Sequence, residues 1–200
     1  MERLKDCRRC DLWKHATQAV PGEGKRPSAL MLVGEQPGDE EDLQGHPFVG
    51  PAGRVLDAAL AEAGLSRADL FVTNAVKHFK WEPRGKRRLH KKPSLGEIRA
   101  CSVWLEQEIV QEKPQVLVAL GTTALRALTG VTMTLERARG ERLRHASGAW
   151  IVACYHPSAI LRAVGVEGAE GKRALELRRL LVEDLKRAAA LAAAPGRGPQ

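Results

Sequence analysis

Apolar residues gather in short runs separated by longer mixed stretches along the chain. Four of these runs consist almost entirely of aliphatic side chains, and they cover residues 29–34, 70–76, 116–120 and 150–155. They lack the alternation of apolar and polar positions that marks a strand with one solvated face. Continuous runs of this kind are typical of parallel strands that are covered on both faces. We therefore expect four central strands buried between layers of helices.

The stretches between these runs carry the spacing of amphipathic helices. Helical spacing of apolar side chains extends over residues 53–63, 94–112, 121–128 and 172–193. The second of these stretches begins with Ser94 and Glu97, which form a capping box. Alternating strands and helices predict a three-layer α/β/α sandwich around a central, mainly parallel four-stranded sheet. The 200 residues suit one domain, which we expect over 1–193, with a flexible tail at 194–200.

The positive charge of the chain favours negatively charged partners. The formal net charge is +8, and residues 77–92 hold most of the clustered Lys and Arg. Such a segment favours nucleic acid or another polyanion, although a solvated surface loop has the same composition. No stretch approaches the ~18 apolar residues of a membrane helix, and residues 1–10 lack the apolar core of a secretion signal. We therefore expect a cytoplasmic protein.

Four cysteines add a second chemical signal. Cys7 and Cys10 form a C-x-x-C pair, and Cys101 and Cys154 stand alone. In a reducing compartment structural disulfides are disfavoured, so the C-x-x-C pair indicates metal, cluster or redox chemistry.

Polar residues follow the predicted strands at the edge where α/β proteins bind ligands. Glu35 and Gln36 follow the first strand, within the sequence G-E-Q-P-G at 34–38. Asn74 ends the second strand, and its amide could read the hydrogen-bonding edge of a base. Taken singly, an exposed Glu and a turn-forming Asn are equally ordinary explanations of these positions.

Three further residues are candidates for binding a flat ring or for reaction at a sugar. Phe48, in the Gly- and Pro-rich loop 45–54, could stack on a base or fill the core. His90 ends the basic sequence K-R-R-L-H, where nearby cations favour a neutral, nucleophilic imidazole. His156 follows the last strand, where a neutral imidazole could donate a hydrogen bond to a departing anion. A phosphate contact and a locally bonded helix-start histidine are the ordinary alternatives for the two histidines.

The order and spacing of these segments resemble family 4 uracil-DNA glycosylases over roughly residues 5–185. The motifs that carry the resemblance are G-E-x-P-G, P-F-V-G-x-A-G at 47–53, T-N at 73–74, L-G at 120–121 and H-P at 156–157. Gln36 and the inserted K-R-R-L-H, which ends at His90, resemble more closely the UdgX-type branch.

This resemblance implies a [4Fe–4S] cluster. Cys7, Cys10 and Cys101 match three of the cysteine ligands of family 4 enzymes, and His78 stands where the remaining cysteine would be. An imidazole can ligate iron in such clusters, so His78 is expected as the fourth ligand. Zinc suits the same ligand set. Cys154 is expected to be a buried structural thiol.

The resemblance also implies roles for the site residues. Phe48 would stack on a flipped-out uracil, Asn74 would pair with its polar edge, and Gln36 would help to bind its carbonyls through a backbone N–H. Basic residues of the K-R-R-L-H segment and its flank would hold phosphates, namely Lys86, Arg87, Arg88 and Lys91.

Glu35 would favour the sugar cation, His156 would stabilise the departing uracilate, and His90 would bond C1′ and form a lasting adduct. The competing hypotheses are an ordinary hydrolytic uracil-DNA glycosylase, a cluster-bearing DNA-binding module without activity, and an enzyme for another damaged base. A monomer acting on uracil-containing DNA is the expectation.

Overall fold

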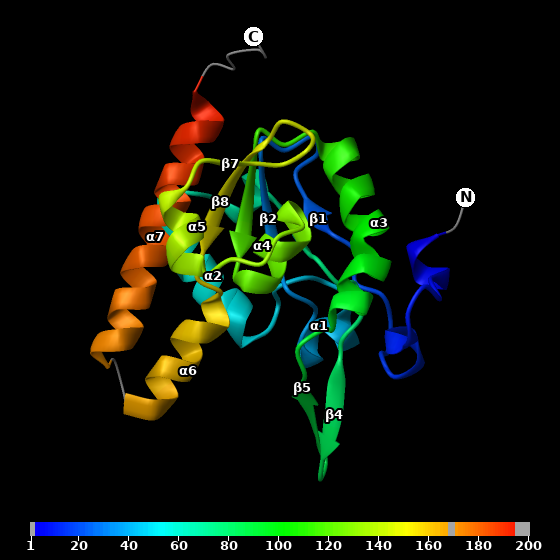
Figure 1. Ribbon diagram of the computed structural model, residues 1–200. Coiled ribbons are helices and arrows are strands. Elements are labelled where there is room, and N and C mark those ends of the chain that lie inside the picture. Colours follow the sequence, from blue (N-terminus) through cyan, green and yellow to red (C-terminus); the bar gives the residue numbers. More distant parts are fainter. Residues whose placement is uncertain (1–2, 168–170, 195–200) are drawn as a thin grey trace.

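The computed structural model describes residues 3–167 and 171–194. Its centre is a six-stranded sheet in the order β1-β3-β2-β6-β8-β7, shown in Figure 1. The four inner strands are parallel and match the four apolar runs. Their bounds are β2 (Leu30–Gly34), β3 (Phe71–Asn74), β6 (Val116–Leu120) and β8 (Trp150–Cys154). The prediction of a central, mainly parallel sheet is confirmed.

Each edge of the sheet carries one short antiparallel strand that the prediction of four strands missed. These strands are β1 (Glu23–Gly24), which pairs with β3, and β7 (Leu143–Arg144), which pairs with β8. Two residues are too few for a periodic pattern, so neither strand could be recognised from the sequence.

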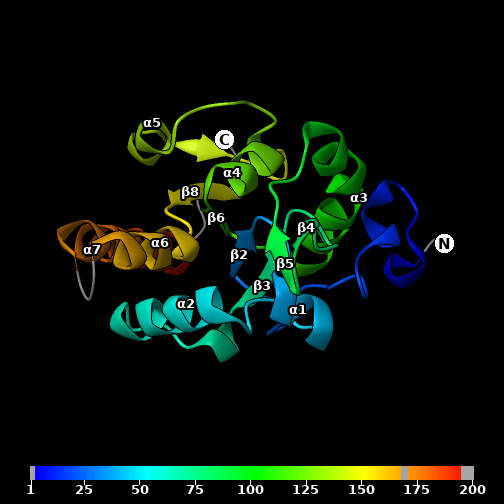
Figure 2. The ribbon, with the colours of Figure 1, turned by 90° about the horizontal axis from the view of Figure 1, so that it is seen from below.

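Helices cover both faces of the sheet, as Figure 2 shows. One face packs against α2 (Pro51–Glu62), α6 (Pro157–Glu167) and α7 (Lys172–Ala193), and the other packs against α3 (Leu95–Glu112), α4 (Thr122–Thr129) and α5 (Leu135–Gly140). Side chains of β2 alternate between the layers, because Leu30 and Leu32 join the first core and Met31 and Val33 join the second. The predicted three-layer sandwich is therefore confirmed.

Local signals explain where the helices start and stop. Ser94 accepts a hydrogen bond from the Glu97 backbone, and the Glu97 carboxylate accepts one from the Ser94 backbone, as the capping box predicted. The short helix α1 (Asp39–Gln44) and helix α6 were not predicted. Among the described residues, no helix has the length and apolarity needed to cross a membrane.

Two structures project from the edge where the parallel strands end. One is a hairpin of β4 (Trp81–Arg84) and β5 (Arg87–His90), and the other is α6, which follows β8 (Figure 1). The predicted tail, 194–200, lies outside the described residues apart from Ala194, the C-cap residue that follows α7.

Candidate active site

The ends of the parallel strands open into one large cavity of about 1520 Å³. Six residues named from the sequence line this cavity together: Glu35, Gln36, Phe48, Asn74, His90 and His156. They come from the ends of β2, β3 and β8, from the loop before α2, and from the projecting hairpin. The rule that ligands bind beyond the carboxyl ends of parallel strands therefore located the cavity correctly.

A carboxylate and an imidazole face one another at the mouth of this cavity. Glu35 Oε1 lies 3.3 Å from His90 Nε2, and Glu35 Oε2 accepts a short hydrogen bond from Thr123 Oγ1. Thr123 is buried in the first turn of α4, so it fixes the direction of the carboxylate. About half of the His90 side chain is exposed, which leaves the ring accessible from the cavity side.

His156 is held in one tautomer by the first turn of α6. The Ser158 backbone N–H donates to His156 Nδ1 at 3.1 Å, and Ser158 Oγ lies 2.8 Å from the same nitrogen. Because a backbone N–H can only donate, Nδ1 is the acceptor and the ring proton sits on Nε2. Burial, with smaller contributions from the nearby His90 and Arg162, lowers the pKa of His156 to about 4. At neutral pH the ring is therefore an uncharged hydrogen-bond donor.

The side chains of Phe48 and Asn74 lie close together over Gly34 and line the cavity there. A Cβ on Gly34 would come within 2.3 Å of Asn74 Oδ1 and 2.6 Å of Phe48 Cζ, so only glycine lets the two side chains approach β2 this closely. The Phe48 ring centroid lies 5.9 Å from that of His156. Phe48 packs against the core and also lines the cavity, so both explanations of this residue describe part of its environment.

The hairpin that carries His90 is fastened at its base by the Gln36 side chain. Gln36 Nε2 donates to the carbonyl oxygens of Lys80 at 3.1 Å and Lys91 at 3.2 Å, and the Lys80 backbone N–H donates to Gln36 Oε1 at 3.1 Å. The side-chain amide is thus fully used in anchoring both strands, a function that the sequence did not indicate.

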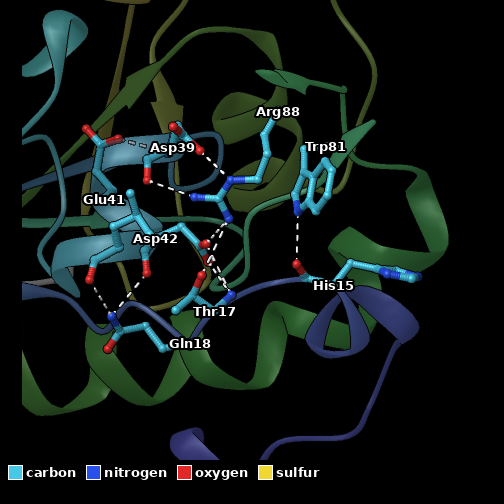
Figure 3. Close-up of polar contacts among 10 residues, drawn as sticks. His15, Thr17, Gln18, Asp39, Glu41, Asp42, Trp81 and Arg88 are labelled. Atoms are coloured by element: carbon cyan, nitrogen blue, oxygen red, sulfur yellow. Dashed lines mark hydrogen bonds and ion pairs between the residues drawn. The ribbon is translucent and has the colours of Figure 1, made fainter. Parts of the chain in front are cut away.

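Arg88 locks the middle of the same hairpin against α1, as Figure 3 shows. Its guanidinium pairs with Asp39 at 2.5 Å and with the fully buried Asp42 at 2.6 Å. On the adjacent strand the Trp81 indole donates to the His15 carbonyl at 2.9 Å. Arg88 therefore faces inward as an ion-pair partner of α1, a contact that the sequence did not indicate, and the phosphate contact expected of it stays a prediction. Lys86 and Arg87 are exposed near the hairpin tip, and Lys91 pairs with Glu82.

Comparisons with known proteins identify the family of this chain. The model of the uracil DNA glycosylase superfamily matches residues 21–186. The chain belongs to the uracil-DNA glycosylase superfamily. It is similar to the type-4 uracil-DNA glycosylase of Thermotoga maritima, at 37% identity over 94% of this chain and 90% of the relative. It is also similar to the type-4 enzyme of Pyrobaculum aerophilum, at 38% identity over 84% of this chain and 85% of the relative.

Three of the four expected cluster ligands of this glycosylase-superfamily protein, all of them cysteines, contact one small apolar cluster that includes residues of α3. Cys7 and Cys101 are buried in one small apolar cluster with Trp104, and Cys10 packs against its rim. Two N–H groups point at these sulfurs, because Trp104 Nε1 donates to Cys7 Sγ and the Lys77 backbone donates to Cys101 Sγ, both at 3.2 Å. Hydrogen bonds of this kind stabilise cluster-bound thiolates.

The described side chains of this region suit a metal chemically but do not surround a metal position. Within residues 3–167 and 171–194, no three side chains of His, Cys, Asp or Glu converge closely enough to hold a metal ion. The cysteines are free thiols, and burial raises the pKa of Cys101 to about 11. His78 is buried, and this burial lowers its pKa, so the ring is neutral and has a lone pair for a metal. The donor set therefore fits a soft metal centre chemically. Cys154 is fully buried in β8, as expected.

Several residues that shape the site in this superfamily member had no predicted role. Thr123 and Ser158 lie at strand ends that the topology rule singles out, so their position was the available signal. Arg67 binds the loop that carries Phe48, and nothing in its local sequence indicates this contact.

Proposed function

We propose that this protein excises uracil from DNA and then bonds covalently to the exposed sugar through His90. The observation that carries the proposal is the contact between His90 Nε2 and Glu35 Oε1, 3.3 Å apart in the cavity lined by Phe48, Asn74 and His156. A histidine beside a carboxylate is the usual arrangement of an activated nucleophile. Similarity to type-4 uracil-DNA glycosylases supports uracil as the base and DNA as the substrate.

Recognition of the base would use two walls of the cavity. Phe48 stacks on the uracil ring, and the Asn74 amide pairs with its polar edge, where cytosine has donor and acceptor exchanged. The exposed cations Lys86 and Arg87 of the hairpin tip hold phosphates of the same strand. Gln36 contributes by anchoring the hairpin, and its backbone N–H is the candidate contact to the uracil carbonyls.

Bond breaking is driven by stabilising charge on both fragments. The C1′–N1 bond breaks and its electron pair leaves with uracil, while the sugar gains cationic character. His156 donates from Nε2 to the departing uracilate, because its Nδ1 is occupied by Ser158. Glu35, oriented by Thr123, provides a negative charge beside the sugar cation.

Trapping follows if His90 reaches C1′ before water does. With His90 Nε2 held by Glu35, the lone pair of the other ring nitrogen bonds C1′, and the Nε2 proton passes to Glu35. The product is a neutral N-alkyl imidazole, and the proton on Glu35 returns to uracil or solvent. An N-alkyl imidazole is a poor leaving group, so each molecule reacts once.

A resident metal centre is part of the proposal but takes no part in these steps. Cys7, Cys10, His78 and Cys101 would hold a [4Fe–4S] cluster, with zinc as the alternative. Its contribution would be structural, since these residues join the N-terminal segment to α3 and to the chain leading into the hairpin.

The test is a denaturing gel. The protein is mixed with a labelled single-stranded oligonucleotide that contains one uracil, heated in detergent and separated. A shifted band that resists this treatment is expected for the wild type, and His90→Ser should lose the band and still release uracil. If the wild type yields only abasic DNA, covalent trapping is wrong and hydrolysis is the reaction. If neither uracil release nor a band appears, the protein is not a uracil-DNA glycosylase.

A further inference from the structure

Arg67 grips the loop that carries Phe48, although it lies nineteen residues further along the chain. It begins the short 3-10 helix η3 (Arg67–Asp69), which precedes β3. Its guanidinium donates to the Pro47 carbonyl at 2.6 Å and to the Phe48 carbonyl at 3.0 Å. The two bonds join consecutive carbonyls to one rigid, planar group, which lysine could not reproduce.

The backbone that Arg67 holds is in an unfavourable conformation. Phe48 has φ +55°, in the left-handed region that residues with a side chain rarely adopt. A non-glycine residue keeps such a conformation only when its surroundings impose it. The Phe48 carbonyl also lies against Gly53, where a Cβ would come within 1.9 Å of the oxygen. Arg67 on one side and Gly53 on the other therefore confine this peptide.

The conformation matters because it directs the aromatic ring into the site. The ring lies over Gly34, next to Asn74 Oδ1, and 5.9 Å from the His156 ring. A change at φ of Phe48 would swing the ring away from this wall. The Phe48 side chain would then no longer present a flat face to a base beside Asn74.

We propose that Arg67 is a positioning residue for uracil excision, which sets the Phe48 ring in its stacking position by clamping the Pro47 and Phe48 carbonyls. The inference rests on the proposed function, in which Phe48 stacks on uracil. Arg67 lies on the far side of the loop and is absent from the cavity lining, so it acts through Phe48 and never contacts the base. Asp57, 3.0 Å from the guanidinium, and Glu23, 3.8 Å away, neutralise its charge.

The experiment is a double-mutant cycle between Arg67→Ala and Phe48→Ala. The measured quantity is the rate constant for release of labelled uracil from a single-stranded oligonucleotide, with the protein in saturating excess so that one turnover is observed. Arg67→Ala should lower this constant by roughly 10-fold or more, the factor by which a non-glycine residue avoids the left-handed region. In the Phe48→Ala background the same substitution should change the constant by less than about twofold, because its effect passes through the ring.

Two matched variants separate clamping from charge and from general stability. Asp57→Ala removes the shorter of the two ion pairs of the same guanidinium and leaves both carbonyl bonds, so the rate constant should stay at the wild-type value. Arg67→Lys keeps the charge but replaces the rigid fork of two nitrogens, each bonded to one carbonyl, by a single nitrogen on a flexible chain, so it should behave like Arg67→Ala. Affinity for an oligonucleotide without uracil should be unchanged in all variants, and this measurement also identifies any variant that fails to fold.

Each outcome separates the clamp from the reaction itself. If Phe48→Ala is slow and Arg67→Ala matches the wild type, the clamp is overturned and the stacking role stands. An equal loss from Arg67→Ala in both backgrounds, or full activity of Arg67→Lys, also overturns the clamp. If Phe48→Ala releases uracil at the wild-type rate, the stacking role falls and the clamp falls with it. A wild type that releases no uracil refutes the proposed function first.

Discussion

Replacing Gln36 by Ala should release the hairpin that carries His90. The side chain is buried and makes three hydrogen bonds to the base of the hairpin, at 3.1, 3.2 and 3.1 Å. The Lys80 carbonyl would keep its bond from the Lys91 backbone, whereas the Lys80 N–H and the Lys91 carbonyl would lose the partner that Gln36 provides. At about 1 kcal/mol for each bond, the loss of these two to three bonds makes the hairpin about 2–3 kcal/mol easier to open.

Hydrogen exchange measures this opening directly. Lowering the free energy of opening the hairpin by about 2–3 kcal/mol raises its open fraction about 30- to 150-fold. Amide exchange over residues 80–91 should accelerate by the same factor. Adduct formation depends on the closed fraction, so it should slow only as far as that fraction falls, which makes hydrogen exchange the more sensitive measurement.

A matched control is available in Gln18. Its side-chain amide donates to the carbonyls of Asp42 at 3.0 Å and Leu43 at 3.1 Å, so it anchors α1 and makes no bond to the hairpin strands. Gln18→Ala should leave exchange over residues 80–91 almost unchanged. If Gln36→Ala leaves this exchange at the wild-type rate, or if both variants accelerate it equally, the anchoring role of Gln36 is refuted.

Three further predictions concern the base pocket, the titration of His156 and the cysteine cluster. Gly34→Ala should slow uracil release by about 10²-fold, because the added Cβ displaces Asn74 and Phe48; Gly140→Ala, with no atom within 4 Å of the added Cβ, is the control and should match the wild type. The pKa of His156 is about 4 in the folded protein against 6.5 unfolded, so its neutral form favours folding above pH 6.5 and that contribution is lost as the pH falls from 6.5 to 4. Between pH 6.5 and pH 4 the free energy of unfolding should fall by up to about 3 kcal/mol more in the wild type than in His156→Gln, and by less where water enters the cavity. Denaturant titrations at the two pH values measure this fall, and an equal pH dependence of the two proteins would contradict the assignment. Cys101→Ser should remove the visible absorbance of an iron–sulfur cluster from the purified protein while Cys154→Ala retains it, and elemental analysis that finds neither iron nor zinc in the wild type would contradict a metal centre there.

The sequence predicted the inner part of the fold because its signals there are local and repeated. The aliphatic run at 116–120 becomes β6 with the same bounds, and Ser94 caps α3 as its spacing with Glu97 indicated. The rule for parallel strands then places Glu35, Asn74 and His156 at one edge from the sequence alone. The positions of these three residues in the fold depend on strand direction and strand order, and the sequence of strands and helices largely determines both.

What the sequence could not provide was the contacts between segments that are distant along the chain. Arg88 sits in a basic run that reads as a phosphate contact, and only the structure brings it to Asp39 and Asp42, forty-nine and forty-six residues earlier. For Gln36 the resemblance implies only a backbone contact to the base, and nothing in the sequence indicates that its side-chain amide reaches Lys80 and Lys91. Such pairings follow from how the hairpin folds over α1, and no periodicity in the sequence encodes that docking.

The most direct test of covalent trapping is the number of uracils that one protein molecule releases. A limiting amount of protein is mixed with a molar excess of uracil-containing oligonucleotide, and free uracil is followed until it stops rising. Covalent trapping through His90 predicts a plateau at one uracil per protein, and release beyond one uracil in His90→Ser. Continued release by the wild type past one equivalent would contradict it.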